Sequence, residues 1–218
     1  MPAWRADYSD RVSLARSLWH ANADLAAAAL AHPFVRGIAD GSLGRDRFAG
    51  YVAQDAYFLE SFARAYALAI AHSPDRAGLD AFADLLDGVR AELRLHASYA
   101  EKWGIDLGTV SPGPATSAYT DFLLATASLG GVGLTCAAMT PCMQLYAYLG
   151  RQLAAGPVDG RYAEWVTTYA DPGFESLAAT LERLLDTYAD GDGPAVVYRR
   201  AMRLEVAFFD AAYRSPAG

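Results

Sequence analysis

A cysteine and a tyrosine placed one helical turn apart are the first side chains in this sequence that could do chemistry. Cys142 follows Pro141 inside an apolar stretch, and Tyr146 comes four residues later. Residues four apart share one face of an α-helix, so the thiol and the phenol would point into the same space. A thiolate is a strong nucleophile, but free cysteine is also one of the most frequently buried residue types. Spacing alone therefore favours a packing role for Cys142, and a catalytic role requires partners from elsewhere in the chain.

Two acidic residues in apolar surroundings are candidates for such partners. Asp55 lies between Tyr51 and Phe58 on the aromatic side of an expected helix, and Glu205 precedes Phe208 on another apolar face. A buried acid is costly unless it is paired or hydrogen-bonded. Burial also raises the pKa of a carboxyl group, which would let it act as a general acid or base.

Several tyrosines add phenol groups to this set. The chain has 13 tyrosines, and Tyr51, Tyr119 and Tyr169 occur in apolar contexts. Each of them alone is more typical of a core residue than of a ligand contact. A nucleophile, two acids and several phenols together would suit a flat, polar, aromatic-sized ligand held inside a helical bundle.

A metal site is the alternative interpretation of the acidic residues. Glu92 and His96 are four residues apart, loosely like the carboxylate–histidine pairs of helical di-iron sites. The other histidines, His20, His32 and His72, complete no second pair, and a lone histidine is weak support for a haem ligand. We therefore expect no metal and interpret His96 as a packed, hydrogen-bonded residue.

The composition favours one well-packed domain spanning residues 1–218. Of these residues, 53% are hydrophobic and 20% are charged, so a large core is possible. The net charge is −7, with acidic and basic residues interspersed. A nucleic-acid-binding protein normally carries a basic patch or stripe, and the sequence shows none, so we expect no nucleic-acid partner.

The cysteines and the N-terminal residues predict a cytoplasmic protein. Cys136 and Cys142 would lie about 9 Å apart along a helix axis and on different faces, which excludes a disulfide. Unpaired thiols suit a reducing compartment, and the chain starts without an apolar signal core. The uncharged stretch 122–150 is long enough for a membrane span, but its glycines and Pro141 fit a buried core segment better. We expect no membrane contact.

Helical periodicity recurs along the chain, and no segment alternates with a period of two, so we predict an all-α bundle. The stretch 34–43, with two glycines, is expected to be an irregular connection, and Ser9 to cap the first helix. The expected helices are Asp10–Ala31, Asp46–His72, a helix ending near Trp103, Thr116–Ser128, a Cys142 helix reaching Ala155, Tyr162–Tyr169, Pro172–Asp190 and Ala195–Tyr213.

Four motifs in order along the chain resemble the TenA family (thiaminase II, aminopyrimidine aminohydrolase). They are His32–Leu43, Tyr51–Leu59, Thr140–Cys142 and Glu205–Phe209. The resemblance implies a haem-oxygenase-like helical bundle, assembled as a homotetramer, that needs no metal or haem cofactor. It also implies hydrolysis of the CH2–N bond of a 4-amino-5-methylpyrimidine compound, thiamin or aminomethyl-aminopyrimidine, to hydroxymethylpyrimidine in thiamin salvage.

The resemblance also assigns residue roles. Cys142 corresponds to the nucleophile, Glu205 to the acid that transfers protons, and Asp55 to the acid that binds the aminopyrimidine. The other substrate-binding positions are Phe58, Tyr119, Tyr146, Tyr169 and Phe208. Addition of the thiolate to the pyrimidine ring would let the amine leave, after which water adds at the methylene and the thiol departs.

The sequence departs from the family pattern at three places. Phe58 stands where some members carry a tyrosine, Met143-Gln144 replaces a pair that is often aromatic, and Tyr148 replaces a common glutamate. These departures concern substrate identity, thiamin or the aminomethyl compound, and leave the proposed reaction residues intact. A regulatory relative that binds a pyrimidine without turnover, and a metal-dependent oxidase using Glu92 and His96, remain as alternatives.

Overall fold

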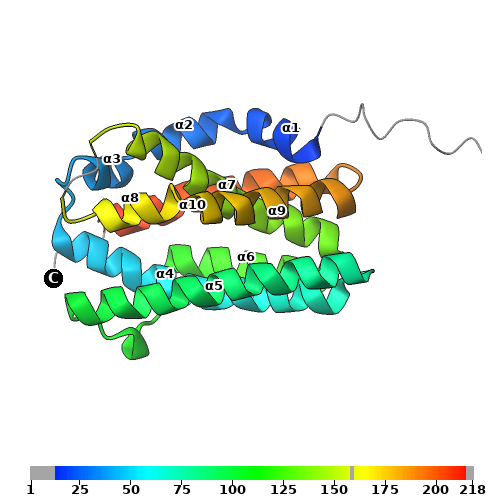
Figure 1. Ribbon diagram of the computed structural model, residues 1–218, viewed down its shortest axis with the longest axis horizontal. Coiled ribbons are helices and arrows are strands. Elements are labelled where there is room, and N and C mark those ends of the chain that lie inside the picture. Colours follow the sequence, from blue (N-terminus) through cyan, green and yellow to red (C-terminus); the bar gives the residue numbers. More distant parts are fainter. Residues whose placement is uncertain (1–12, 158–159, 215–218) are drawn as a thin grey trace, which may run out of the picture.

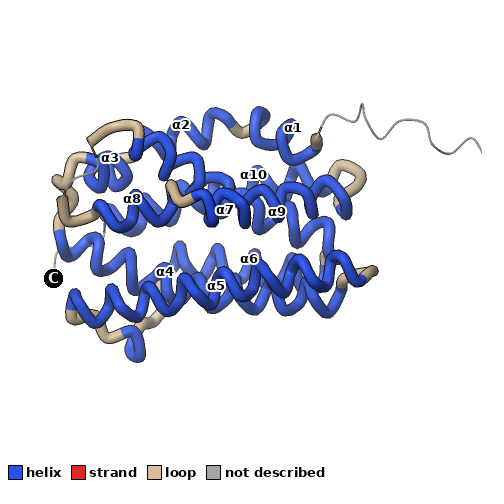
Figure 2. Tube along the Cα trace, in the orientation of Figure 1, coloured by secondary structure: helices blue, strands red, loops and turns tan. Residues whose placement is uncertain are grey.

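The computed structural model describes residues 13–157 and 160–214, and these residues form helices joined by short turns (Figures 1 and 2). No strand occurs among them, which confirms the all-α prediction. The elements are α1 (Leu14–Ala21), α2 (Ala23–Ala31), α3 (Pro33–Ala39), α4 (Arg45–His72), α5 (Arg76–Trp103), the 3-10 helix η1 (Leu107–Thr109), α6 (Pro114–Leu129), α7 (Gly131–Ala154), α8 (Ala163–Tyr169), α9 (Pro172–Tyr188) and α10 (Gly193–Arg214).

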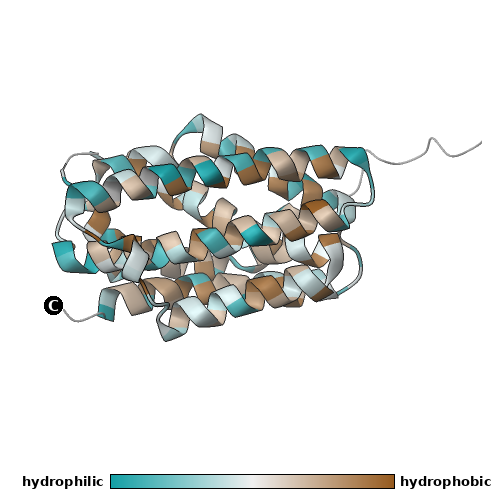
Figure 3. Ribbon diagram, turned by 90° about the horizontal axis from the view of Figure 1, so that it is seen from below, coloured by the Kyte–Doolittle hydropathy of each residue, from teal (hydrophilic) through white to brown (hydrophobic). Residues whose placement is uncertain are grey.

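The helices pack in tiers around α7. In Figure 1, α4, α5 and α6 form the lower part of the molecule, α8, α9 and α10 the middle, and α1 to α3 the top. Helix α7 packs against α4, α6, α8, α9 and α10. Figure 3 shows hydrophilic and hydrophobic residues alternating along each helix, as expected for helices with one exposed and one buried face. Any site in the interior is therefore built from several helices around α7.

The stretch 34–43 was expected to be irregular, and this was wrong for most of its length. Helix α3 begins at Pro33, a residue that suits the first helical position, and the His32 side chain accepts a hydrogen bond from Phe34 N. Gly37 does not break the helix. A Cβ there would lie 3.0 Å from Leu43 Cβ, so the glycine allows the chain to fold back closely. Packing, rather than backbone freedom, explains this glycine.

The first predicted helix is divided in two. Asn22 interrupts it between α1 and α2 and is buried. Its side-chain Nδ2 donates to Leu18 O at 2.8 Å, and its Oδ1 accepts from Arg199 of α10 at 3.0 Å. Ser13 caps α1, whereas Ser9, the predicted cap, lies outside the described residues.

Helix α7 runs uninterrupted through Pro141. Thr140 Oγ1 donates to Cys136 O at 2.7 Å, and both cysteines are free thiols, as expected. Near its end, a Cβ on Gly150 would lie 2.3 Å from the carbonyl carbon of Tyr169, so α7 and the end of α8 approach as closely as backbones can. This contact fixes Tyr169 relative to α7.

Membrane insertion finds no support in the helices that the structure describes, because none combines the length and the apolar composition that a bilayer span requires.

Candidate functional site

The predicted reaction residues meet where α6, α7 and α10 come together. Tyr119 OH donates to Glu205 Oε1 at 2.6 Å, and Cys142 lies beside Glu205, close enough for the two side chains to shift each other's pKa. Glu205 and Tyr119 are buried, and Cys142 is partly buried. The three side chains form a short chain in which Glu205 is the central group.

Burial raises the pKa of both Glu205 and Cys142. The pKa of Glu205 becomes about 7, although Tyr119 and Cys142 oppose that change. The pKa of the Cys142 thiol is raised well above its usual value by burial first, and then by the negative charges of Glu205, Asp55 and Glu92. The resting cysteine is therefore a thiol with a carboxyl group beside it to receive its proton.

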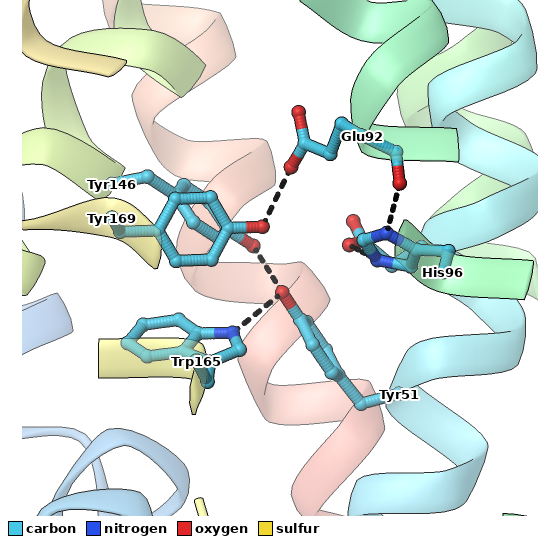
Figure 4. A network of polar contacts seen from close by, with 7 residues as sticks. Tyr51, Glu92, His96, Tyr146, Trp165 and Tyr169 are labelled. Carbon is cyan, nitrogen blue, oxygen red and sulfur yellow. Dashed lines mark hydrogen bonds and ion pairs between the residues drawn. The ribbon is translucent and has the colours of Figure 1, made fainter. Parts of the chain in front are cut away.

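Asp55 lies opposite this chain, on α4, and is paired with a histidine. His96 Nε2 lies 2.7 Å from Asp55 Oδ2, and His96 Nδ1 lies 3.1 Å from the main-chain oxygen of Glu92 (Figure 4). Because a carbonyl oxygen only accepts, Nδ1 must carry a proton. The pair then needs one further proton between Nε2 and the carboxyl group.

That proton belongs to the histidine. Burial alone would lower the pKa of His96, but the hydrogen bond to Asp55 and the charges of Asp55 and Glu92 raise it to about 9. Asp55 and His96 thus form a buried ion pair at neutral pH.

Glu92 extends this side of the site toward α8. Its Oε1 accepts a hydrogen bond from Tyr169 OH at 2.8 Å. Burial and the charge of Asp55 raise the pKa of Glu92 to about 7, against the effects of His96 and Tyr169. Sequence spacing suggested Glu92 and His96 as metal ligands, but the His96 ring nitrogens face an aspartate and a main-chain carbonyl. Within residues 13–157 and 160–214, no group of three or more potential ligands could hold a metal ion.

Aromatic side chains close the space between the two acids that line the cavity, Asp55 and Glu205. Tyr51 OH donates to Tyr146 OH at 3.2 Å and accepts from Trp165 Nε1 at 3.3 Å (Figure 4). The Tyr146 and Tyr169 rings meet edge to face with centroids 4.7 Å apart. Burial, the largest cause in each case, raises the pKa of Tyr51, Tyr146 and Tyr169 well above the usual value, so these phenols remain hydrogen-bond donors.

Six of the eight residues predicted from the sequence line one small cavity, with about 150 Å³ of space between their atoms. They are Asp55, Phe58, Tyr119, Tyr146, Glu205 and Phe208. Cys142 lies beside the cavity residue Glu205, and Tyr169 stands one ring behind Tyr146. The structure therefore brings all eight predicted residues together, from five different helices.

Of the three departures from the family pattern, Phe58 lines this cavity, whereas Met143-Gln144 and Tyr148 do not. Gln144 accepts a hydrogen bond from Tyr198 of α10, and Tyr148 packs edge to face on Trp19 of α1, with centroids 5.4 Å apart. Met143 lines a separate groove next to Glu92.

The sequence did not identify the pairing of His96 with Asp55 or the contact between Trp165 and Tyr51. The spacing of Glu92 and His96 was a usable signal, because it placed both on one face of α5. No sequence signal identified Trp165.

Comparisons with known proteins identify the family and several relatives. Residues 19–215 match the model of the TENA/THI-4/PQQC family. The aminopyrimidine aminohydrolase of Halalkalibacterium halodurans is 33% identical, with 93% of this chain and 96% of that protein covered. The mitochondrial bifunctional TH2 protein of Arabidopsis thaliana is 36% identical over 82% of this chain. The chain spans only about a third of the length of that relative, at 34%.

Solved structures agree on the fold. A protein described as a TenA family transcription regulator, from Silicibacter sp. TM1040, has a TM-score of 0.86 and 28% identity, covering 93% of this chain and 97% of that chain. A domain of unknown function with a heme oxygenase-like fold, from Shewanella denitrificans, has a TM-score of 0.74 and 15% identity, covering 91% of both chains. The expected haem-oxygenase-like fold is confirmed.

Proposed function

Because the chain belongs to the TENA/THI-4/PQQC family, we propose that it is an aminopyrimidine aminohydrolase of thiamin salvage. Its reaction would be hydrolysis of the CH2–N bond of 4-amino-5-aminomethyl-2-methylpyrimidine to hydroxymethylpyrimidine and ammonia. The observation that carries this proposal is the placement of Cys142 next to Glu205, itself bonded to Tyr119, beside a cavity lined by aromatic rings.

Cys142 would act as the nucleophile. As Sγ forms a bond to the pyrimidine ring, its proton passes to Glu205, so no free thiolate has to persist in the buried site. A pKa of about 7 leaves a large fraction of Glu205 ionised at neutral pH and able to accept that proton. The hydroxyl of Tyr119 supports the carboxylate at 2.6 Å.

The aminomethyl nitrogen would react as the free amine, and Glu205 would then return the proton to this leaving nitrogen. The C–N bond breaks, ammonia departs, and an exocyclic methylene remains on the ring. Water adds to this methylene and gives a proton to Glu205. The C–S bond then breaks, and the proton on Glu205 restores the Cys142 thiol, which balances the reaction.

Asp55 would hold the pyrimidine. Its carboxylate can accept hydrogen bonds from the exocyclic amino group and from a protonated ring nitrogen, and protonation makes the ring a better electron acceptor. The 2.7 Å contact with His96 fixes the orientation of that carboxylate. His96 acts through Asp55 and is thus a positioning residue.

The charges favour a cationic substrate. Two carboxyl groups, Asp55 and Glu205, line the site cavity and a third, Glu92, lies next to it, whereas His96, paired with Asp55 at 2.7 Å, is the positively charged group among them. An aminomethyl substrate carries an ammonium group, whereas the hydroxymethyl product has lost that charge. The site would bind substrate more tightly than product, and thiamin, also a cation, is a second candidate.

The assembly and location stay predictions of the same proposal. Light scattering of the purified protein tests the homotetramer, which should show four times the chain mass of 23.3 kDa. The cytoplasmic location is a separate prediction.

Regulation without turnover is the second candidate, favoured by the description of the Silicibacter protein as a transcription regulator. Chromatographic detection of hydroxymethylpyrimidine released from the aminomethyl substrate separates the two. The hydrolase should release it catalytically. Binding of the pyrimidine with no release by purified protein would support the regulator instead.

A further inference from the structure

The groove next to Glu92 has a volume of about 510 Å³ and lies between α5, α7, α8 and α9. This volume is within the range typical of small-molecule sites, about 300–1,000 Å³. None of the residues that line the site cavity, such as Asp55 and Glu205, also lines this groove. A ligand in the groove would therefore leave the space assigned to the pyrimidine free.

The walls of the groove are mainly apolar. On α5, Leu85, Val89 and Glu92 follow one another at spacings of four and three residues, so they lie on one face of the helix. Phe174 and Leu177 of α9 form the facing wall. Such walls favour the hydrocarbon part of a ligand, because its burial removes apolar surface from water.

A single carboxyl group with an open acceptor is set among these walls. Glu92 Oε1 accepts a hydrogen bond from Tyr169 OH at 2.8 Å, whereas Oε2 accepts none from the residues that the structure describes (Figure 4). A carboxylate oxygen that is removed from bulk water without a hydrogen-bond donor is costly. A ligand with an N–H donor at one end would supply the missing bond.

The charges around the groove are negative. Among its lining residues in the described part of the chain, the acidic ones are Glu92 and Asp171, and there is no lysine or arginine. Asp171 lies at the start of α9, where its Oδ1 accepts from Gly173 N at 2.7 Å. This charge distribution favours a cationic donor over a neutral one and disfavours an anion.

The groups that face Glu92 from the neighbouring helices determine its own charge. Burial and the charge of Asp55 on α4 raise the pKa of Glu92 to about 7, while His96 on α5 and the Tyr169 hydroxyl on α8 lower it. Cys142 on α7 is an uncharged thiol at rest, because its own pKa is raised. Glu92 is thus mainly ionised at pH 8, and a cation in the groove favours the ionised form further.

We propose that this groove is a second ligand site, which takes an amine in its ammonium form attached to an apolar body. The ammonium group would donate to Glu92 Oε2, and the hydrocarbon part would pack between α5 and α9. Because the site cavity stays free, an amine and a pyrimidine would bind at the same time. The proposal does not depend on the proposed function, because it needs no turnover.

Calorimetry with phenethylamine at pH 8 tests the chemistry of this site, since an alkylamine is protonated at that pH and Glu92 is mainly ionised. Phenethylamine should bind at least about tenfold more tightly than 2-phenylethanol, which has the same shape without the charge. Glu92→Gln should lower the affinity for phenethylamine about tenfold and leave that for 2-phenylethanol unchanged.

A matched pair of variants on α5 tests the location. Ala91 lines the groove and is exposed, so Ala91→Phe should fill the groove and abolish phenethylamine binding without disturbing the core. Ala97 is also exposed on α5 but does not line the groove. Ala97→Phe should therefore bind phenethylamine as the wild-type protein does. Both variants should keep their affinity for hydroxymethylpyrimidine.

Four results would overturn this proposal. They are no binding of phenethylamine to the wild-type protein, equal affinity for phenethylamine and 2-phenylethanol, equal effects of Ala91→Phe and Ala97→Phe, and displacement of phenethylamine by hydroxymethylpyrimidine, which would place the amine in the site cavity. A protein that binds phenethylamine in the groove but releases no hydroxymethylpyrimidine from the aminomethyl substrate would contradict the proposed function alone.

Discussion

The two halves of the site surround their central acids with different partners. The binding half, Asp55, His96, Glu92 and Tyr169, pairs an aspartate with a protonated histidine at 2.7 Å. The reaction half, Cys142, Glu205 and Tyr119, contains no cation, and its carboxyl group has only a thiol and a phenol as partners. The first half holds an ion pair at rest, whereas in the second the thiol keeps its proton beside a carboxyl group of pKa about 7.

This difference indicates that substrate binding and reaction are carried out by different residues. An ionised, oriented Asp55 is ready to bind a pyrimidine before the substrate arrives. A thiol beside a carboxyl group of pKa about 7 becomes nucleophilic only when its proton can move to Glu205. Binding and reaction should therefore be separable by mutation.

The largest effect is expected from removing the nucleophile. Cys142→Ser should lower kcat by roughly 10³-fold or more, because a serine hydroxyl ionises far less readily than a thiol. Hydroxymethylpyrimidine binding, measured by calorimetry, should change little because Asp55 and His96 are intact. Undiminished turnover would remove Cys142 from the mechanism.

Glu205→Gln comes next and should lower kcat by roughly 10²- to 10⁴-fold, with a smaller change in KM, because the amide cannot carry a proton. In the wild-type protein, kcat/KM should fall as pH decreases through about 7, where Glu205 becomes protonated and cannot accept the thiol proton. Glu92 also has a pKa of about 7, so Glu92→Gln is the control. This variant should still lose kcat/KM as pH decreases through about 7. An increase in KM alone would make Glu205 a binding residue.

The binding half should respond mainly in affinity. Asp55→Asn should raise the dissociation constant for hydroxymethylpyrimidine about 10- to 100-fold, the loss of a charge-assisted contact, with a smaller effect on kcat at saturation. Unchanged binding by calorimetry would remove this role from Asp55.

His96→Gln should also raise the dissociation constant for hydroxymethylpyrimidine, by less than Asp55→Asn does. It should in addition change how the stability of the protein depends on pH. Since the folded-state pKa of His96 is raised from 6.5 to about 9, its contribution to stability is present below pH 6.5 and is lost as pH rises through about 9. Urea unfolding at pH 7 and 9.5 should show the stability difference between wild type and variant shrinking at the higher pH. A constant difference would contradict the ion pair.

The smallest effect is expected from Tyr169→Phe, which removes the 2.8 Å hydrogen bond to Glu92 and raises the pKa of that carboxyl group further. KM should rise only a few-fold, about 1 kcal/mol or less, because the ring still packs on Tyr146. A loss as large as that of Asp55→Asn would place Tyr169 in direct contact with the substrate.

Much of the fold followed from the sequence because its long helices carry continuous apolar faces. The range predicted for α4 differs from the observed helix by one residue at its start. The short helix α3 was missed because Gly37 was interpreted as a breaker, when it is needed for close contact with Leu43. Such contacts between distant parts of the chain leave no periodic signal.

The site could be predicted only in part for the same reason. The residue types could be recognised, and the family motifs related them to one another, but Cys142 alone was indistinguishable from a core cysteine. The pairing of Asp55 with His96 joins residues 41 positions apart on two helices, and only their packing brings these side chains to 2.7 Å.

The claim that Cys142 passes its proton to Glu205 is tested most directly by the pH at which the Cys142 thiolate forms. It can be followed by the rate of alkylation in a Cys136→Ala background, which leaves a single thiol. The charge of Glu205 raises the pKa of Cys142, so Glu205→Gln should make the thiolate form at lower pH while turnover falls. A thiolate that forms at higher pH in Glu205→Gln would mean that Glu205 stabilises the thiolate rather than receiving its proton, and would contradict the account.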